Sequence, residues 1–396
     1  SLALSGGGLH VFAAGLAFSG LSISDCAAIL PGVGMGGGLA AFFAILLGGG
    51  LSISGCASSF TGGGLHGAYV FSVDPATLAP GSLPSVSITD NRAGTFAGGI
   101  SCISNSVLAL GPGAAINGNA AGYQGGGALV LAATLAVSGP ASAMTGNIGP
   151  TGGGAIFLPS GTVSLTDVAL TDNTAYGGAA LFVSLAAGGR ETSVASLDRC
   201  TLARNTATGL VGGALQVLSC TAVTVTDSVF EGNVAVKGGG ANVNGEGAVP
   251  VPGAATTDPD PAAPAPVAFT RTTFRGNVAQ YGGGLHVSLG GDVSLTDCVF
   301  EGNAARAAGG GAAVGEGGTL RAVRSTFSAN GNFSCFTLPA LGGGLAVGID
   351  DFKPVASCAV PDAVPARAAL ADCAFDANLA AEAGGGVSVR AGRFAA

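Results

Sequence analysis

Short stretches of alternating apolar and polar residues run along the chain, separated by glycine-rich segments. In one clear example, Leu285 and Val287 flank His286, and Val293 and Leu295 continue the same alternation. A period of two residues indicates a β-strand with one apolar side. We therefore expect Leu285 and Val287 to face a core and His286 to lie on the outward side of the strand.

The parity of the alternation changes within each repeat, which predicts corners. Cys298 and Phe300 are two apart but lie on the opposite parity from Leu295, so the chain must turn near Thr296–Asp297. A second corner is expected at Gly302–Asn303, because glycine and asparagine best tolerate a left-handed backbone. A glycine triplet makes a third bend. Three short strands and three corners per turn describe a parallel β-helix.

The glycine pair or triplet that opens each unit recurs along the whole chain, at intervals that are most often about 25 to 27 residues. These glycines begin at Gly6, Gly36, Gly62, Gly98, Gly125, Gly152, Gly177, Gly212, Gly238, Gly282, Gly309, Gly342 and Gly384. Such a period is typical of a solenoid, in which each unit buries its apolar face by stacking on the next. We predict an all-β fold: a single-stranded, right-handed parallel β-helix of about 12 coils that is continuous over residues 1–396. Because the repeat reaches both ends, we expect this chain to be a segment of a longer protein.

An asparagine lies three residues after an apolar anchor in ten of the repeats. These asparagines are Asn91, Asn119, Asn147, Asn173, Asn205, Asn233, Asn277, Asn303, Asn330 and Asn378. Asparagine favours turns in general, but that preference explains one or two positions and not ten in register. Stacked amides can hydrogen-bond from one strand to the next. The pattern predicts an asparagine ladder along one corner.

Three residues before the anchor, the sign of the charge alternates through seven repeats. The column consists of Asp167, Arg199, Asp227, Arg271, Asp297, Arg324 and Asp372. Stacked strands lie about 4.8 Å apart, so neighbouring opposite charges would pair, and a shift by one coil would oppose like charges. We interpret the column mainly as a control of register. The alternative is a chance alternation on a solvated face.

Several segments interrupt the repeat and predict inserted loops. The segment 249–266 is rich in proline and alanine and has no apolar periodicity, which is typical of an exposed, extended loop. Further insertions are expected at 331–341 and 350–366. In a solenoid, such loops mark a face that is free to contact partners.

Charge is distributed very unevenly. Residues 1–160 contain only Asp25, Asp74, Asp90 and Arg92, and the net charge of the whole chain is −8. This balance and the absence of a basic patch argue against a nucleic-acid partner. The longest apolar run, residues 39–47, is far shorter than the roughly 20 residues of a membrane-spanning helix. The uncharged part is either a surface of small residues or a surface covered by neighbouring chains.

Nine cysteines are spread along the chain. Cys26 and Cys56 occupy equivalent positions in adjacent coils, and the spacing of stacked strands suits a disulfide. Cys335 and Cys358 lie in neighbouring insertions and form a second candidate pair. Either bond would imply an oxidising compartment. The remaining cysteines lack zinc-ligand spacing, and those two residues before the anchor (Cys200, Cys298 and Cys373) are expected to be small buried thiols.

The three histidines, His10, His66 and His286, each follow a glycine triplet and a leucine. The common motif predicts outward-facing side chains that lie too far apart to share a metal ion. Asn332 opens the sequon Asn-Phe-Ser and is a candidate N-glycosylation site if the chain is secreted. No cofactor is expected.

Parallel β-helices include enzymes that cut acidic polysaccharides, so an enzymatic function has to be considered. Such enzymes need carboxylates that converge on a groove beside a basic group. In this chain the carboxylates alternate with arginines along the axis instead. We therefore expect no enzymatic activity and keep a polysaccharide lyase or hydrolase as the least favoured alternative.

The combination of Gly282–Val287 with Phe300–Asn303, and of Gly238–Val243 with Phe274–Asn277, resembles the polymorphic outer-membrane-protein repeat. That repeat is known from bacterial autotransporter passengers and from surface proteins of some algae. The composition, rich in alanine and glycine and poor in lysine, is more similar to a green-algal surface glycoprotein. The resemblance implies extracellular display, adhesion or matrix building, and it brings no catalytic residues.

These observations predict a non-catalytic structural segment of a secreted or cell-surface protein. It would pack with other chains in an extracellular filament, wall or ciliary-surface appendage, with residues 1–160 as the candidate contact surface and glycans as further partners. The alternative is a surface adhesin that binds a receptor or glycan through its inserted loops.

Overall fold

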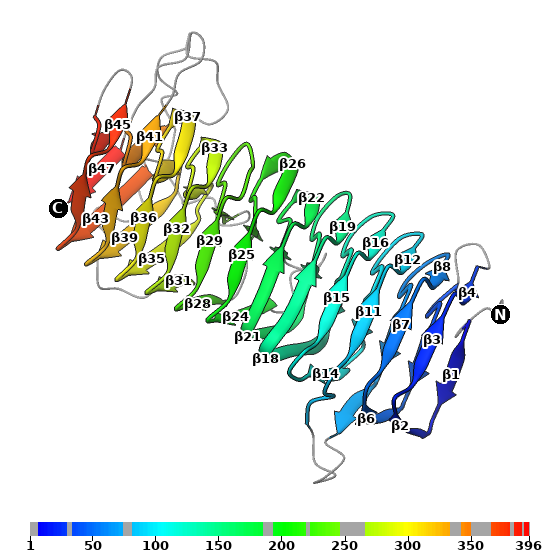
Figure 1. Cartoon of the computed structure of the whole chain (residues 1–396). Helices are drawn as coiled ribbons and strands as arrows, with labels where there is room; N and C mark the ends of the chain where they lie inside the picture. Colours follow the sequence, from blue (N-terminus) through cyan, green and yellow to red (C-terminus); the bar gives the residue numbers. More distant parts are fainter. Residues whose placement is uncertain are drawn as a thin grey trace. The chain divides into compact units, whose positions relative to one another are not determined.

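In the computed structural model, every regular element of the described residues is a β-strand, as predicted. The structure describes residues 7–29, 34–73, 81–184, 193–218, 222–245, 266–332, 342–349, 366–380, 384–389 and 392–395. The chain forms two compact units, Ser1–Thr201 and Leu202–Ala396. In each unit the strands of successive turns lie side by side and pair in parallel, which confirms the predicted β-solenoid (Figure 1).

Each turn of the first unit contributes to three sheets. The first sheet contains β1 (Leu9–Phe12), β5 (Leu39–Phe42), β9 (Leu65–Ala68), β13 (Ile100–Ile103), β17 (Ala128–Leu131), β20 (Ile156–Leu158) and β23 (Leu181–Val183). The second contains β2 (Gly15–Ser19), β6 (Ile45–Gly49), β10 (Phe71–Val73), β14 (Val107–Leu110), β3 (Ser22–Ser24), β7 (Ser52–Ser54), β11 (Ser87–Thr89), β15 (Ala115–Asn117), β18 (Ala133–Thr145), β21 (Gly161–Thr171) and β24 (Ser193–Asp198). The third contains β4 (Ala27–Ala28), β8 (Ala57–Ser58), β12 (Arg92–Ala93), β16 (Ala120–Ala121), β19 (Ile148–Gly149) and β22 (Thr174–Gly177).

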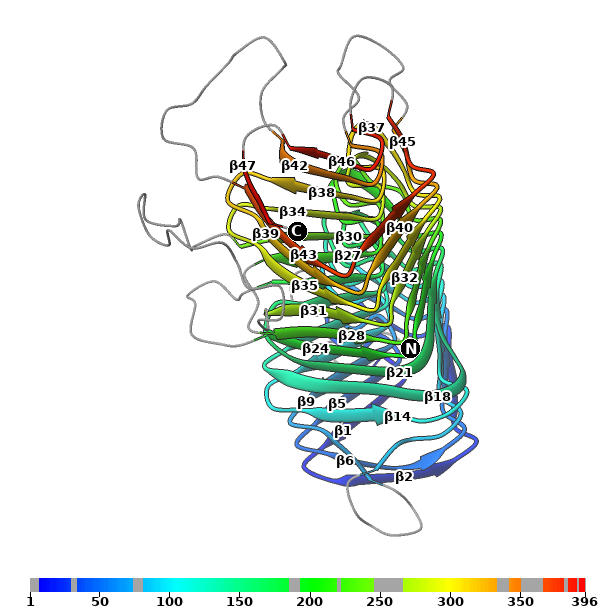
Figure 2. The same ribbon diagram turned by 90° about the vertical axis from the view of Figure 1, so that its left-hand side faces the viewer.

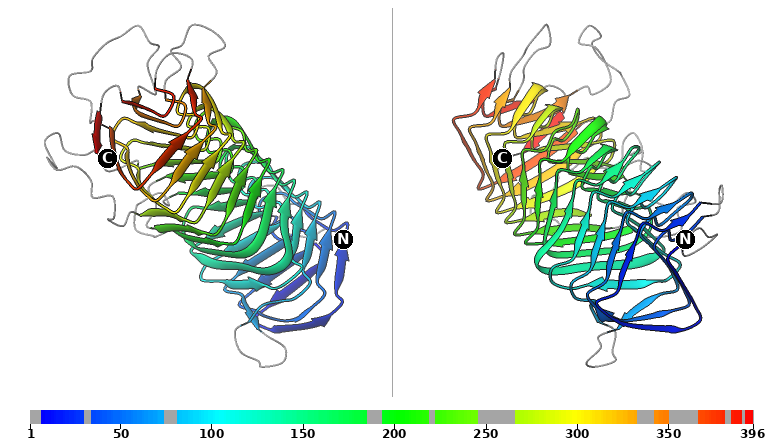
Figure 3. Two further views of the ribbon diagram at one scale, coloured as in Figure 1. Left: turned by 60° about the vertical axis from the view of Figure 1, so that its left-hand side comes forward. Right: turned by 45° about the vertical axis from the view of Figure 1, so that its right-hand side comes forward.

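The second unit repeats this arrangement. Its first sheet contains β27 (Leu215–Leu218), β30 (Ala241–Asn244), β34 (Leu285–Ser288), β38 (Ala312–Gly315), β42 (Leu345–Ile349) and β46 (Val387–Val389). Its second contains β28 (Ala222–Thr226), β31 (Val267–Thr270), β35 (Asp292–Thr296), β39 (Thr319–Val323), β43 (Ala366–Ala371), β47 (Gly392–Ala395), β25 (Thr201–Ala203, which begins at the last residue of the first unit), β29 (Val229–Glu231), β32 (Thr273–Arg275), β36 (Val299–Glu301), β40 (Thr326–Ser328) and β44 (Ala374–Asp376). The short outer strands are β26 (Thr206–Val211), β33 (Val278–Tyr281), β37 (Ala304–Ala308), β41 (Gly331–Asn332) and β45 (Leu379–Ala380). Figures 2 and 3 show the turns from other sides.

The corners fall where the change of parity predicts them. Asp297 has a φ of 55° and Gly302 a φ of 61°, so both adopt the left-handed conformation that turns the chain. The glycine triplet makes the third corner. Gly282 has a φ of 62°, and a Cβ atom on Gly283 would lie 2.4 Å from the carbonyl oxygen of Gly310 in the next turn. A side chain is therefore strained at the first glycine and has no space at the second.

The apolar anchors form the centre of the core. In the second unit Phe230, Phe274, Phe300 and Phe327 are fully buried, and their rings stack turn upon turn with centroids 4.6 to 4.8 Å apart. In the first unit the same column consists of aliphatic side chains such as Ile53 and Ile88, which pair directly. Register is thus set by identical or similar side chains placed over one another.

The insertions fall mostly outside the described residues. This holds for 246–265, 333–341 and 350–365, which include most of the predicted loops 249–266, 331–341 and 350–366. The predicted start of the second loop at residue 331 is wrong, because Gly331 and Asn332 form strand β41. This strand pairs with Ala304 and Ala305 of strand β37. The continuity of one β-helix over residues 1–396 stays a prediction, since the two units are described separately.

Candidate interaction surface and its supporting ladders

The predicted asparagine ladder is present in both units. In the first unit, Nδ2 of Asn91 donates to Oδ1 of Asn119 at 3.0 Å, and the same bond joins Asn119 to Asn147 at 3.1 Å and Asn147 to Asn173 at 3.0 Å. In the second unit the bond recurs at 2.9 to 3.0 Å. It links Asn205, Asn233, Asn277, Asn303, Asn330 and Asn378 in this order.

Each ladder amide also satisfies the backbone at the corner. Oδ1 of Asn119 accepts the backbone N–H of Asn91 at 3.0 Å, and Nδ2 of Asn119 donates to the carbonyl oxygen of Ile88 at 2.8 Å. These side chains are fully buried, except that of Asn378, which is half-buried. A buried amide is costly unless its donors and acceptors are paired. The ladder therefore stabilises a corner that would otherwise leave polar backbone groups unpaired.

Cys26 and Cys56 occupy the asparagine position in the first two turns, which the sequence analysis did not recognise. The backbone N–H of Cys56 donates to Oδ1 of Asn91 at 2.9 Å, and that of Cys26 donates to Sγ of Cys56 at 3.4 Å. The sequence does contain a signal for this position. Cys26 and Cys56 follow the anchors Ile23 and Ile53 by three residues, as the asparagines follow theirs. The thiols thus continue the ladder with a weaker acceptor.

The predicted disulfide between Cys26 and Cys56 is not formed, since both are free thiols in the structure. Each Sγ instead donates to the carbonyl oxygen two residues earlier, that of Ser24 at 3.2 Å and that of Ser54 at 3.3 Å. Burial raises the pKa of Cys56 to about 11. The thiol is therefore protonated and unreactive at neutral pH. Cys335 and Cys358 lie outside the described residues.

Of the cysteines two residues before the anchor, Cys200 and Cys298 are buried thiols, as expected, and Cys373 is half-buried. Sγ of Cys200, Cys298 and Cys373 donates to the carbonyl oxygen two residues earlier at 3.3 to 3.5 Å. Ser228 and Thr272 make the same contact at 2.8 and 3.1 Å. Burial raises the pKa of Cys200 and of Cys298 to about 11. These thiols act as small hydrogen-bonding side chains at a corner.

The charge column forms ion pairs with ideal fork geometry. Arg199 donates from Nε and Nη2 to the two oxygens of Asp167 at 2.8 and 3.0 Å. Arg271 pairs with Asp227 at 2.6 and 2.7 Å, and Arg324 pairs with Asp297 at 2.7 and 2.9 Å. Each arginine thus reaches back to the aspartate of the preceding turn.

The pKa shifts of the charged side chains in this column follow from the alternation of their signs. The hydrogen bond from Arg324 lowers the pKa of Asp297, and the charge of Arg271 on the other side lowers it further. Asp372 adds to the raised pKa of Arg324. The pairs are exposed, so each one stabilises the fold only slightly. All charged members of this column have a left-handed backbone, which places their side chains on the outside of one corner.

Two further ion pairs lie among the described residues of the second unit. Arg275 donates to Glu231 at 2.8 Å, in the parallel column one residue after the anchor. Arg321 pairs with Asp292, which the sequence analysis missed. Asp292 lies at the start of a strand and Arg321 two residues into the next one, so no single repeat position links them.

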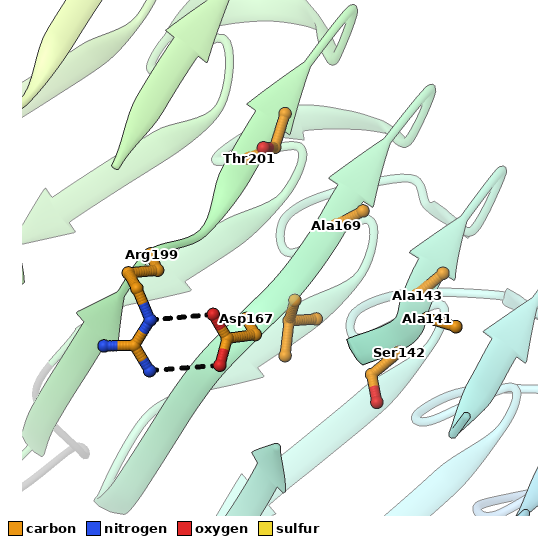
Figure 4. Close-up of a pocket in the computed structure, with 8 residues that line it drawn as sticks. Ala141, Ser142, Ala143, Asp167, Ala169, Arg199 and Thr201 are labelled. Atoms are coloured by element: carbon orange, nitrogen blue, oxygen red, sulfur yellow. Dashed lines mark hydrogen bonds and ion pairs between the residues drawn. The ribbon is translucent and has the colours of Figure 1, made fainter. Parts of the chain in front are cut away.

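A shallow pocket of about 280 Å³ lies at the beginning of the charge column in the first unit (Figure 4). Its lining includes Asp167, Arg199, Ala141 and Ser142. Ala141 and Ser142 lie where the register of strand β18 shifts, between Ser138 and Ser142. Both carboxylate oxygens of Asp167 are bound by Arg199, as Figure 4 shows. The arrangement is that of a surface ion pair rather than of a general acid or base.

His66 and His286 alternate with core residues and so lie on the outer side of their strands, but both side chains are buried there. The glycine corner explains this burial. Gly62 lies so close over the strand that a Cβ atom on it would be 2.8 Å from Cβ of His66. The chain that leads into the corner therefore covers the outer face of the first sheet. His10 is exposed, and the strand of Ala40 lies between it and His66, as expected.

The two buried histidines have different surroundings. Nδ1 of His286 lies 2.6 Å from Oδ1 of Asn242, whose Nδ2 donates to Gln216 at 3.0 Å. Both nitrogens of His66 lack a hydrogen-bond partner, and so does the hydroxyl of Ser101 in the neighbouring strand. Burial lowers the pKa of His66 to about 4. His66 is therefore neutral at physiological pH.

Large apolar side chains are exposed mainly in the first unit. There they are Phe12, Ile29, Phe43, Ile45, Tyr69, Phe71, Tyr123, Leu131, Ile148 and Tyr176. In the second unit they are Val234, Val278, Leu379, Val389 and Phe394. With the exception of Tyr176, the aromatic side chains in the first group lie within residues 1–160, which have almost no charge. This coincidence of exposed apolar and missing charged side chains is typical of a protein interface.

Other candidate chemistry is limited in the part of the chain that the structure describes. No three His, Cys, Asp or Glu side chains gather there to hold a metal ion. The described residues also include no helix that could span a membrane. The backbone of Asn332 lies in strand β41, and the rest of its sequon is outside the described residues.

The chain matches no protein-family model, no curated protein and no solved structure.

Proposed function

We propose that this chain is a non-catalytic structural segment of a secreted or cell-surface protein, and that it packs with other chains in an extracellular filament, wall or ciliary-surface appendage. The observation that carries this proposal is the surface of the first unit. Exposed aromatic side chains such as Phe43 and Tyr69 lie within residues 1–160, where only four residues are charged. A partner chain that covers them would remove apolar surface from water at little electrostatic cost.

The ion-paired carboxylates support the non-catalytic part of this proposal. Asp167, Asp227 and Asp297 each bind an arginine through both oxygens. Carboxylates held in this way maintain register between turns and are not free to transfer protons to a sugar. The resemblance to the polymorphic outer-membrane-protein repeat is part of the same proposal, as are extracellular location and glycosylation.

The test compares the isolated chain with the native material from which it derives. Hydroxyl-radical footprinting suits it, because residues 1–160 contain no lysine for amine cross-linkers. We expect Phe43, Tyr69 and Tyr123 to be oxidised in the isolated chain and protected in the native material. Val278 and Leu379 of the second unit should be oxidised equally in both.

Equal oxidation of the aromatic side chains in both samples would contradict the proposal. Binding of the isolated chain to a glycan array, with no such protection, would favour an adhesin. Release of unsaturated sugars from an acidic polysaccharide would favour a lyase.

A further inference from the structure

Three aromatic side chains form an exposed row at one corner of the first unit. Phe12, Phe43 and Tyr69 come from successive turns and are 64%, 57% and 42% exposed. The rings of Phe43 and Tyr69 are parallel, with centroids 4.7 Å apart, and the ring of Phe12 meets Phe43 edge-on at 6.0 Å. Phe43 and Tyr69 therefore stack at the spacing of the strands, whereas Phe12 pairs in the sheet with Phe42 and lies one residue before the equivalent position.

Two more apolar side chains extend this row. Ile45 follows Phe43 by two residues and pairs in the sheet with Phe71, which follows Tyr69 by two residues. Both are exposed, at 49% and 44%. We call Phe12, Phe43, Ile45, Tyr69 and Phe71 the aromatic corner. From residue 26 to residue 73 the chain has no Asp, Glu, Lys or Arg.

The backbone of this corner does not require aromatic residues. Phe43 and Tyr69 have φ values of 49° and 54°, which are unfavourable for bulky side chains. Ala13, Ser104 and Ala132 hold the same corner in other turns of the unit, also with positive φ. Large side chains at strained and exposed positions point to a role outside the folding of the chain.

We propose that the aromatic corner is a self-association site and that its occupant is a second copy of this chain. The inference rests on the proposed function and names the partner for one part of the uncharged surface. The absence of charge favours a like partner, because two such surfaces meet without opposing or burying a charge.

The distance between the two stacked rings also favours a copy over an unrelated partner. A surface with two rings 4.7 Å apart fits best against one with the same interval. In a two-fold contact the rows would run antiparallel, and Phe43 would lie near the axis. Ring edges of one copy would then lie against ring faces of the other, an arrangement that aromatic pairs prefer.

Sedimentation velocity of the purified chain over a concentration series tests this inference, up to on the order of 100 μM. We expect a reversible dimer. Phe43→Ala combined with Tyr69→Ser should weaken the dimer by about tenfold or more, as expected when central aromatic contacts are lost. Both replacements occur at the same corner in other turns, so the fold should keep its thermal midpoint.

The matched control is Ile148→Ser combined with Tyr176→Ser. These two side chains are 47% and 49% exposed and belong to the third sheet of the same unit. This control should leave the dissociation constant unchanged within about twofold, whereas loss of the dimer in both double variants would indicate unspecific apolar association and overturn the inference.

A chain that stays monomeric throughout the series would also overturn the inference. The proposed function would survive that result if the footprint of the native material still shows protection within residues 1–160. It would then be another chain that covers the aromatic corner.

Discussion

Nδ2 of Asn277 donates to Oδ1 of Asn303 at 2.9 Å, although the two residues are 26 positions apart in sequence. Oδ1 of Asn303 accepts the backbone N–H of Asn277 as well, at 3.1 Å. One side chain therefore holds both the amide and the backbone of the preceding turn. The same relationship recurs in both units, and it makes the corner a chain of mutually dependent contacts.

Replacing one ladder residue should be strongly destabilising. Asn277→Ala would remove the acceptor of the backbone N–H of Asn233 and of one of its two amide hydrogens, and the donor to the carbonyl oxygen of Phe230. We expect the free energy of unfolding to fall by about 3 kcal/mol or more, because each unpaired buried group costs about 1–3 kcal/mol. Chemical denaturation measures this change, with the exposed Asn105→Gly as control. A loss no larger than that of the control would contradict a structural role for the ladder.

Extending the ladder should stabilise the first unit. In Cys56→Asn, the new Oδ1 would replace a sulfur that accepts the backbone N–H of Cys26 at 3.4 Å. The new Nδ2 would lie near the carbonyl oxygen of Ile23, which is 4.0 Å from Sγ of Cys56. We expect a gain of about 1 kcal/mol, seen as a higher denaturation midpoint. Cys56→Ala should instead destabilise, and equal stability of the two variants would argue against the shared column.

The stability that the charge column provides should depend on the alternation of charge along the column and not only on the individual ion pairs. Exchanging the partners, as Asp297→Arg with Arg324→Asp, keeps one pair but brings like charges next to Arg271 and Asp372. The backbone tolerates both residue types, since Arg271 and Asp297 share a positive φ. We expect a lower thermal midpoint for the exchange variant at low salt, and a smaller difference at 1 M salt because of screening. A wild-type midpoint at low salt would show that alternation is irrelevant.

Acidification should destabilise the first unit through His66. Its pKa in the folded chain is about 4, below the ordinary value of 6.5, so only the unfolded chain binds a proton between these values. Stability is therefore complete above pH 6.5 and falls as the pH decreases toward 4, by about 3 kcal/mol. Urea denaturation at pH 7 and pH 4.5 measures the difference between the two conditions.

The matched variant for this pH dependence is His66→Leu, because Leu129 occupies the same sheet column two turns later. It should lose most of the difference between the two pH values. An equally steep loss in this variant would assign the acid sensitivity to other groups.

The strand pattern, the corners and the asparagine ladder could be predicted because a solenoid converts a repeat in sequence directly into a contact between turns. Residues such as Asn277 and Asn303 are equivalent by position, so stacking one turn on the next brings them together. Alternation around Leu285 and Val287 correctly assigned the side that faces the core. Parity likewise located the corner at Asp297.

What the sequence by itself determined was therefore everything that depends on position within one repeat. Only the tertiary structure decided what covers the outside of the turns. His66 is buried because the glycine corner folds the incoming chain over the strand, whereas Phe43 is exposed although its ring stacks on that of Tyr69 in the next turn. An alternation of period two does not distinguish these two residues. It shows on which side of a strand a side chain lies but not what packs against that side.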